Sequence, residues 1–586
     1  MWRAVAARPA RRHRISGTAA PTDKDVMNTR IQGGGRRTRA VRRTTSLVAV
    51  LALAGVTAAA CGGSDDASGT PAADATPVAG GKLTYATIQE PGCLDPGYDP
   101  STVTGVINRN IFDSLVSQTA TGETKPWLAT SWTVSPDGKT YRFSLRDGVR
   151  FHDGSAFDAT AVKATFDHAV DPATKSLYAG ALLSAYQETR VIDPRTAEVV
   201  LERPDATFLQ SVGTPSLGIQ SPASLRRSAE ELCTKPVGSG AFTFVSWTKN
   251  RDLVLAKNTA YQWAPDAASH DGPAYLDGIT FQFISDDTAR FGALTSGQVQ
   301  VVNNVPAANI RTLKANNSLQ YLRADSPGLT FSLLLNPTRE PLSDVRVRRA
   351  LLRAVNLDEL VTSVYFGEYR RAWSLLSPTT IGYDKSLEGT WKVDQALANR
   401  LLDEAGWTER DGDGFRTKDG KRLTVVWRTG AQLDRDSRGV VAQGVQADAK
   451  KVGIDLQYIS EDVGTFSQHI FAADLDIWGG SYQRPDGDIL RFAFASDQGI
   501  TKGGGNLYGL NDATLDRLLN EASTTTDTAV RTKNWAEAQQ YIIDNALAVP
   551  LTVGANLVGA SEKVHGLRFE QSSNLAFFDT WLDPTK

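Results

Sequence analysis

The stretch Pro327-Gly-Leu-Thr-Phe-Ser-Leu-Leu-Leu-Asn-Pro337 has the pattern of a strand that is buried on both faces. Residues 329–335 are apolar almost throughout, and a short apolar run bounded by turn residues is typical of a strand inside a sheet. The run stops at Asn336-Pro337, because proline cannot donate a hydrogen bond to a neighbouring strand. We therefore predict a core strand here.

An amphipathic helix is expected directly behind this strand, with Ser343 or Asp344 as its cap. Its apolar residues follow the spacing i, i+3, i+4, i+7, i+8 and form one face: Val347, Ala350, Leu351, Ala354 and Val355. The arginines fall on the solvent-facing side: Arg346, Arg348, Arg349 and Arg353. Such a strand and helix could be the interior of one domain, but we predict that the chain crosses here from one lobe to another.

The length of 586 residues exceeds what one hydrophobic core supports, so two or three domains are expected. Apolar residues make up 41% and charged residues 22% of the chain, which is typical of a soluble globular protein. Residues 1–46 hold twelve basic and two acidic residues, whereas the rest holds 51 basic and 63 acidic residues. This acidic remainder argues against nucleic acid or an anionic membrane surface as a partner.

The N-terminal segment 1–60 has the features of a signal peptide. Five arginines between residues 36 and 43 precede Leu47–Ala60, which is fourteen residues without a charge and shorter than the roughly 20 residues that span a bilayer. The small residues that end at Cys61 resemble the lipobox of bacterial lipoproteins, in which the cysteine receives lipid and becomes the mature N-terminus. Ala58 stands where lipoproteins prefer leucine, so ordinary secretion is the alternative, and Met27 is a second candidate start. We predict that lipid on Cys61 is the only membrane attachment.

Residues 61–81 are expected to form a flexible tether, because the segment after Cys61 contains only Gly, Ser, Asp, Ala, Thr, Pro and one Val. Two cysteines follow, Cys93 and Cys233. A disulfide is chemically permitted in an exported chain, and we expect these two residues to pair. Two separate buried thiols are the alternative.

The region 126–154 predicts a hairpin and carries a family resemblance. Pro126-Trp-Leu-Ala-Thr-Ser-Trp132 is followed by the turn Ser135-Pro-Asp-Gly-Lys139 and by Tyr141–Leu145, which alternates as a strand. The extracellular solute-binding proteins of peptide/nickel-type ABC importers carry Leu-Ala-x-Ser-Trp, an Asp-Gly turn, Leu-Arg-x-Gly-Val and Phe-His-Asp-Gly in this order, and this chain resembles them. The resemblance runs from about residue 82 to 582 and includes Pro236–Phe242 with Trp247, Asn336–Leu360 and Leu401–Trp407.

This resemblance implies an α/β, two-lobed periplasmic-binding-protein-like fold with two crossover strands and an extra subdomain in the first lobe. The crossings would be Thr330–Leu335 and Val549–Val553. The implied division is lobe one at 82–118, 236–328 and 555–586, the extra subdomain at 119–235, and lobe two at 329–554.

The resemblance also implies a function. The chain would be a lipid-anchored extracytoplasmic receptor that captures a small peptide-like or oligosaccharide-like solute and delivers it to an ABC transporter permease. It would act as a monomer and without a cofactor. An extracellular hydrolase and a sensory receptor on the same fold are the alternatives.

Catalytic and metal-binding motifs are not expected. His152-Asp153-Gly154 invites a catalytic interpretation, but a turn accounts for the aspartate and no nucleophile motif accompanies it. Glu409-x-Asp411-x-Asp413-Gly414 imitates a calcium loop, but Gly420 stands at the twelfth position, where a bidentate Glu is required. No two histidines have i, i+4 spacing, which argues against a resident transition metal: His13, His152, His168, His270, His469 and His565.

The segment Asp476–Asp486 is the most indicative of ligand binding. In peptide-binding relatives the corresponding stretch reads Trp-x-Ala-Asp-Tyr, and its Asp pairs with the α-amine of the ligand. Some relatives also carry an Arg three residues before the Trp for the ligand carboxylate. Here these positions are Ser481 and Leu475, so both charges are missing.

The remaining side chains of this segment are suited to stacking on a ring and to neutral hydrogen bonds. We therefore predict a neutral or weakly charged polar solute, although Asp486 or Glu90 could supply an acceptor for an amine. The alternative is that Trp478 and Tyr482 are ordinary core aromatics. The predicted ligand-binding residues are Trp478, Ser481, Tyr482, Trp427, Asp486 and Glu90.

Overall fold

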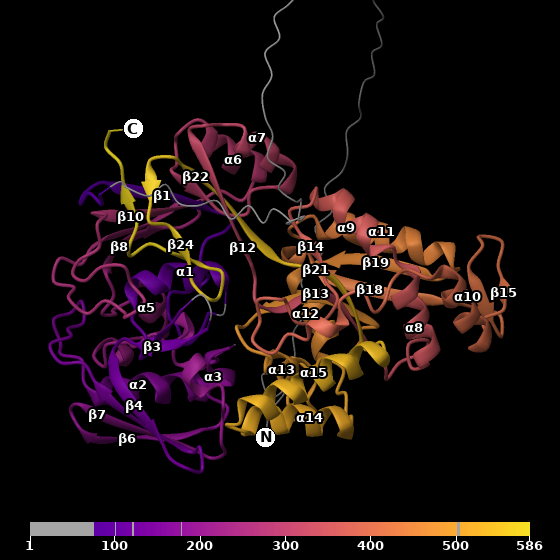
Figure 1. Ribbon diagram of the computed structural model, residues 1–586, viewed down its shortest axis with the longest axis horizontal. Helices are drawn as coiled ribbons and strands as arrows, with labels where there is room; N and C mark the ends of the chain where they lie inside the picture. Colours follow the sequence, from indigo (N-terminus) through magenta and orange to yellow (C-terminus); the bar gives the residue numbers. More distant parts are fainter. Residues whose placement is uncertain (1–75, 100, 120–121, 177, 501–503, 586) are drawn as a thin grey trace, which may run out of the picture. The chain divides into compact units, whose positions relative to one another are not determined.

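Three larger sheets organise the residues that the computed structural model describes, which are 76–99, 101–119, 122–176, 178–500 and 504–585. Two are mixed sheets of seven and six strands, and the third has four antiparallel strands (Figure 1). The predicted signal peptide, Cys61 and the tether up to residue 75 lie outside the described residues. Within these residues, no helix has both the length and the apolar character that a membrane span requires.

The seven-stranded sheet joins distant parts of the chain and forms lobe one. At its centre, β1 (Lys82–Thr87) runs parallel to β10 (Gly278–Phe283) and to β11 (Val301–Val302). The other strands are antiparallel to their neighbours: β8 (Phe242–Thr248), β9 (Asp252–Lys257), β12 (Leu319–Asp325) and β22 (Ala555–Ser561). Three helices contact this sheet: α1 (Thr102–Ile111), α6 (Asp287–Thr295) and α7 (Ile310–Lys314).

The four-stranded sheet lies within the segment predicted as the extra subdomain. Its strands follow in the spatial order β4 (Ala129–Val134), β5 (Thr140–Leu145), β7 (Thr196–Leu201) and β6 (Tyr186–Asp193). Tyr141, Phe143 and Leu145 are buried and alternate with exposed residues, which confirms the predicted hairpin of β4 and β5. The helices of this region are α2 (Ala159–Val170), α3 (Ala179–Leu182), α4 (Phe208–Ser211) and α5 (Ala229–Thr234).

The six-stranded sheet forms lobe two, with the predicted core strand in its interior. β13 (Gly328–Leu335) is buried at every residue because it has a strand on each side and helices over the sheet. Its companions are β14 (Arg370–Arg371), β18 (Thr424–Gly430), β19 (Asp455–Glu461), β20 (Ile477–Gln483) and β21 (Ala548–Val553). The helices of lobe two are α8 (Val345–Ala354), α9 (Leu357–Tyr365), α10 (Gln395–Glu404), α11 (Arg438–Lys451), α12 (Val463–Phe471), α13 (Ile489–Phe494), α14 (Ala513–Thr524) and α15 (Thr528–Asp544).

The remaining strands form smaller ribbons. They are β2 (Val116–Gln118) with β3 (Thr124–Pro126), β15 (Glu409–Arg410) with β16 (Arg416–Lys418) and β17 (Lys421–Arg422), β23 (Val564–His565) with β26 (Trp581–Leu582), and β24 (Arg568–Phe569) with β25 (Leu575–Ala576).

Helix α8 begins where the sequence predicts it, but the prediction that all four of its arginines face solvent is wrong for Arg348. The Asp344 carboxylate accepts a hydrogen bond from the Arg346 backbone N–H at 2.8 Å, which is the expected cap. Arg348 is only 6% exposed and not solvent-facing. Its guanidinium donates to the carbonyl oxygens of Leu342 at 2.7 Å and Asn545 at 3.1 Å, so it links the loop before α8 to the end of α15.

Two short connections join the lobes. β12 leads through residues 326–327 into β13, and β21 leads through Gly554 into β22. The backbone N–H of Ser326 donates to the carbonyl of Gly554 at 2.8 Å, so the two connections lie side by side. The predicted crossings 330–335 and 549–553 belong wholly to the lobe-two sheet, and the chain passes between the lobes just before the first and just after the second.

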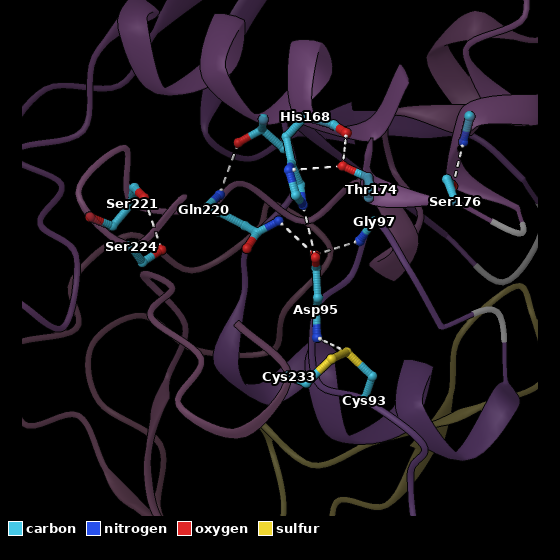
Figure 2. Close-up of polar contacts among 12 residues, drawn as sticks. Cys93, Asp95, Gly97, His168, Thr174, Ser176, Gln220, Ser221, Ser224 and Cys233 are labelled. Carbon is cyan, nitrogen blue, oxygen red and sulfur yellow. Dashed lines mark hydrogen bonds and ion pairs between the residues drawn. A yellow bond between two sulfur atoms is a disulfide. The ribbon is translucent and has the colours of Figure 1, made fainter. Parts of the chain in front are cut away.

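A buried polar cluster ties lobe one to the subdomain next to a disulfide between Cys93 and Cys233 (Figure 2). The Asp95 carboxylate, in the loop after β1, is 5% exposed and lies 2.8 Å from His168 Nε2 of α2. It also accepts a hydrogen bond from Gln220 Nε2 at 3.1 Å. These contacts give the buried carboxylate the partners that it needs.

Candidate functional site

Both large sheets bring the carboxyl ends of parallel strands to the contact between the lobes. Open α/β sheets bind ligands at such ends. β1 and β11 supply these ends in lobe one, and β18 and β20 supply them in lobe two. Asn304, just after β11, donates through Nδ2 to Asp436 Oδ1 of lobe two at 3.1 Å. Thr102 Oγ1 of lobe one donates to Oε1 of Gln483, the last residue of β20, at 3.1 Å.

Lobe one contributes two buried polar atoms at this edge. Thr87 Oγ1 lies on the last residue of β1, and Asn303 Oδ1 follows directly after β11. Neither atom has a partner with full hydrogen-bond geometry in the part of the chain that the structure describes, but both side chains lie beside the buried Tyr85 hydroxyl. Buried polar atoms normally have one, so both are candidates to bind a polar group of a ligand.

In lobe two, β20 carries three of the predicted site residues, and they lie on two different faces of the sheet. Neighbouring residues of a strand point to opposite faces of the sheet, so Trp478 and Tyr482 share one face and Ser481 lies on the other. The Trp478 and Tyr482 rings stack at a centroid distance of 5.4 Å and an interplanar angle of 17°. These three residues therefore do not form a single ligand surface.

Trp478 has the environment of a core residue. It is 5% exposed, and its indole covers Gly480 so closely that a Cβ there would come within 1.9 Å of the ring. Its backbone N–H donates to the Tyr508 hydroxyl at 2.7 Å. Tyr482 packs edge-on against Phe492 of α13, and burial raises the pKa of Tyr482 to about 12. The structure thus favours the core interpretation of Trp478 over ring stacking with a ligand.

Trp427 lies on the same face of the sheet as Ser481. Its ring is 1% exposed and rests on Gly479, where a Cβ would come within 2.5 Å of the indole. Tyr458 packs edge-on at 4.9 Å, and Phe331 of β13 lies at 6.2 Å. The indole Nε1–H has no hydrogen-bond partner among the described residues. Trp427 is therefore a packed residue that keeps one buried donor unused.

Ser481 is bound by an arginine that the sequence interpretation missed. Arg438 Nη2 donates to Ser481 Oγ at 2.8 Å, and its guanidinium carbon lies 4.3 Å from the centre of the Phe331 ring. The arginine is 7% exposed, and burial lowers its pKa. No sequence signal identifies Arg438, because it is the first residue of α11 in a stretch of alternating charges, 434–438.

Asp486 is already committed to a cation of its own chain. Its carboxylate lies 3.2 Å from Arg484 Nε and accepts from the Asp488 backbone N–H at 2.9 Å. Arg484 Nη2 also lies 3.1 Å from Asp488 Oδ2 and donates to Thr207 Oγ1 of the subdomain at 3.0 Å. Burial raises the pKa of Asp488 to about 6, while the charge of Arg484 opposes this rise. Asp486 thus stabilises Arg484 at the contact between the lobes and is not an unoccupied acceptor for an amine.

A small polar cavity adjoins this ion-pair cluster. Tyr178 and Asp205 line it from the subdomain, and Arg484 and Asp488 line it from lobe two. Its volume of about 20 Å³ holds about one water molecule. The cavity is therefore too small for a solute in this arrangement of the lobes.

Glu90 likewise serves its own lobe. Its Oε2 accepts from Trp247 Nε1 at 3.2 Å and from the Asn250 backbone N–H at 3.0 Å. These contacts hold the β1 loop against the turn between β8 and β9. Among the predicted site residues, the structure brings Ser481 and Trp427 to one face and places Glu90 and Asp486 in contacts of their own.

The residues of the two segments that resemble a catalytic site and a calcium loop are also bound by other residues of the chain. His152 Nε2 lies 3.0 Å from the Gly240 carbonyl, and Asp153 accepts from Ser221 Oγ at 2.6 Å. Asp411 and Asp413 pair with Arg422. In the described ranges, no three His, Cys, Asp or Glu side chains are grouped as metal ligands.

Comparisons with known proteins agree with this geometry. A family model described as bacterial extracellular solute-binding proteins, family 5, middle, matches residues 123–499. The glutathione-binding protein GsiB of Escherichia coli (strain K12) is 27% identical over 493 residues, which are 83% of this chain and 91% of that protein.

Two solved structures share the fold at similar identity. The ABC transporter-associated periplasmic binding protein DppA from Helicobacter pylori, solved with peptide STSA, has 26% identity and a TM-score of 0.73, covering 86% of this chain and 98% of that one. NikA from Brucella suis, solved with Fe(III)-EDTA, has 25% identity and a TM-score of 0.76, covering 86% and 100%. Because the family model matches more than half of the chain and the likeness in structure extends over both lobes, the chain belongs to family 5 of the bacterial extracellular solute-binding proteins, the receptors of peptide/nickel-type ABC importers.

Proposed function

We propose that this protein is a lipid-anchored extracytoplasmic receptor that captures a small polar solute between its lobes and delivers it to an ABC permease. The observation that carries the proposal is a set of buried polar atoms without a hydrogen-bond partner among the described residues. Thr87 Oγ1 and Asn303 Oδ1 lie at the carboxyl ends of two lobe-one strands, and Trp427 Nε1 lies in the middle of β18 in lobe two. One relative of this chain is named for binding glutathione and another was solved in complex with a peptide, which supports a peptide-like solute. We propose the lobe and subdomain boundaries stated above, and a monomer.

Solute binding is expected to make the protein more compact, because two short connections, 326–327 and 554, allow the lobes to close by a hinge motion. A thermal-shift screen of di- to pentapeptides, glutathione and oligosaccharides identifies the solute. At about 100 times its Kd, a bound solute stabilises the folded protein by about 2.7 kcal/mol. Small-angle scattering then measures the radius of gyration with the hit and, as a control, with a solute that gives no shift.

An unchanged radius of gyration at saturating hit would contradict the closure mechanism. Recovery of the hit in chemically unchanged form separates a receptor from a hydrolase. A solute that is consumed during incubation would favour the hydrolase instead.

Replacement of Cys61 by serine is expected to release the protein from the membrane fraction into the medium. The reason is that lipid on Cys61 is the one attachment proposed here, and a protein without it has no acyl chains in the bilayer. Immunoblots of fractionated cells measure the distribution, with Ser64→Ala as the matched control in the same segment. A Cys61→Ser protein that stays with the membranes would refute the lipid anchor.

A further inference from the structure

We infer that residues 205–207 of the subdomain, here called the latch segment, bind lobe two and hold the lobes closed through polar contacts that do not involve the solute. This inference rests on the proposed receptor function, in which the lobes open and close. It concerns which contacts set the balance between the two states.

The subdomain is fastened to lobe one. The disulfide between Cys93 and Cys233 joins the loop after β1 to α5, and Asp95 of the same loop lies 2.8 Å from His168 of α2. The connections 326–327 and 554 lie between lobe one and lobe two. A hinge motion at these connections therefore carries the subdomain along with lobe one, and the contacts of the latch segment with lobe two must break when the lobes open.

The latch segment is held in one conformation by its own subdomain. The Tyr141 hydroxyl of β5 donates to the Asp205 carbonyl at 3.0 Å. The Asp205 carboxylate in turn accepts from the backbone N–H of Thr207 at 2.9 Å and from the Thr207 hydroxyl at 2.8 Å. A segment that is already ordered loses little conformational entropy when it docks on another surface.

Lobe two binds both backbone groups of Ala206. The N–H donates to the Ser523 carbonyl at 3.0 Å, and the carbonyl accepts from Arg531 Nη1 at 3.1 Å. Ser523 lies in the last turn of α14, where carbonyl groups have no partner within the helix. The latch segment thus supplies a donor to a helix end that would otherwise bind water.

Arg484 of lobe two adds a contact with a charged donor. Its Nη2 donates to Thr207 Oγ1 at 3.0 Å, and the same hydroxyl donates to Asp205. Arg484 and Asp205 also line the same small cavity. A chain of hydrogen bonds therefore runs from a cation of lobe two to a carboxylate of the subdomain, and hydrogen bonds to charged groups are stronger than neutral ones.

The polar character of these contacts suits a latch that opens and not a permanent joint. The large apolar core of lobe two and that of lobe one with its subdomain have no residue in common within the described ranges. Polar groups that separate can bind water instead, whereas separated apolar faces would be exposed to it at a high cost in free energy. The contact can therefore break and form again with a small net change.

The double variant Thr207→Val/Arg531→Gln, here called the latch variant, tests the inference. It removes the acceptor for Arg484 and the donor to the Ala206 carbonyl. Arg531→Gln alone is a second, milder variant that keeps the buried Thr207 hydroxyl. It should change both quantities below in the same direction by a smaller factor, and it is used if the double variant does not fold.

The matched control is Thr130→Val/Arg517→Gln, which makes the same two changes outside the contact. Thr130 donates to the Ser144 carbonyl within the subdomain, and Arg517 pairs with Glu521 within lobe two. Both partners move with their own residue when the lobes open. The control should therefore behave like the wild type in both measurements.

The first measurement is deuterium uptake at the Ala206 amide without a solute, by mass spectrometry of the peptides that contain it. The wild type and the control are expected to exchange this amide at least about fivefold more slowly than the latch variant, because its hydrogen bond to Ser523 forms only when the lobes are closed. Equal exchange in the wild type and the latch variant would overturn the inference and leave the receptor proposal intact.

The second measurement is calorimetry with two probes, glutathione and the tetrapeptide Ser-Thr-Ser-Ala. The latch variant is expected to bind both about tenfold more weakly and by the same factor, because it changes the fraction of closed protein and not the contacts of the solute. Unchanged affinities would overturn the inference, and so would factors that differ between the probes, since these residues would then contact the solute. If fewer than two probes bind, the exchange at Ala206 decides the inference and the solute screen decides the receptor proposal.

Discussion

Replacement of Cys93 and Cys233 together by alanine is expected to lower the free energy of unfolding by about 4–5 kcal/mol, because the disulfide closes a very long loop. The two cysteines are 140 residues apart in the sequence. A cross-link over that separation removes many conformations from the unfolded chain, and its loss returns them. Since the loop encloses the whole four-stranded subdomain, the loss should be largest in the unfolding of lobe one with its subdomain. Urea titrations followed by tryptophan fluorescence measure the effect.

The wild-type protein under reducing conditions provides the control for the double alanine variant. Both lack the cross-link but only one has changed side chains, so agreement of their midpoints assigns the effect to the disulfide. If the oxidised and reduced wild-type proteins unfold at the same urea concentration, the disulfide does not stabilise the native state and the expectation is refuted.

Trp478→Ala is expected to lower the free energy of unfolding by about 3–5 kcal/mol through the cavity that it leaves in lobe two. The indole is 5% exposed, stacks on Tyr482 and covers Gly480, so no neighbouring side chain fills the space once the ring is removed. The affinity of the folded variant for its solute should change little, because Trp478 lies on the face of β20 opposite to Ser481. Denaturant unfolding and calorimetry on the same preparation measure both quantities.

Tyr482→Phe is the companion variant, since it keeps the stacked pair and removes only a hydroxyl. It should have nearly the stability of the wild type. If Trp478→Ala instead unfolds like the wild type and loses about 1–3 kcal/mol of binding, the scale for stacking on an aromatic ring, then Trp478 is a ligand residue after all.

Local pattern was sufficient to predict the first strand and the first helix of lobe two. The apolar run 329–335, the Asn-Pro stop and the Asp344 cap predicted β13 and α8 because each depends on neighbours in the sequence. The burial of Arg348 could not be predicted in this way. It depends on the end of α15, which lies nearly 200 residues further along the chain.

The candidate site shows the same limit. The period of two along β20 already separates Trp478 and Tyr482 from Ser481, so this division could have been predicted once the strand was recognised. The ion pair of Asp486 could also have been predicted, because its partner Arg484 is two residues away in the sequence. The contact of Arg438 with Ser481 could not be predicted from the sequence. The two residues are 43 positions apart, and only the packing of α11 beside the sheet brings them together.

The strand order of the two large sheets has a consequence for how the chain matures. Lobe two is one uninterrupted segment from β13 to β21, so it can fold as soon as that segment has emerged from the ribosome or the export machinery. Lobe one cannot, because β22, which comes near the end of the chain, is the strand that links β11 to β12. Pairing of β22 with strands more than 200 residues earlier is a slow, non-local event. Its insertion completes the lobe-one sheet and the second connection in one step, so capture of a solute begins only when the last strand of the large sheets is in place.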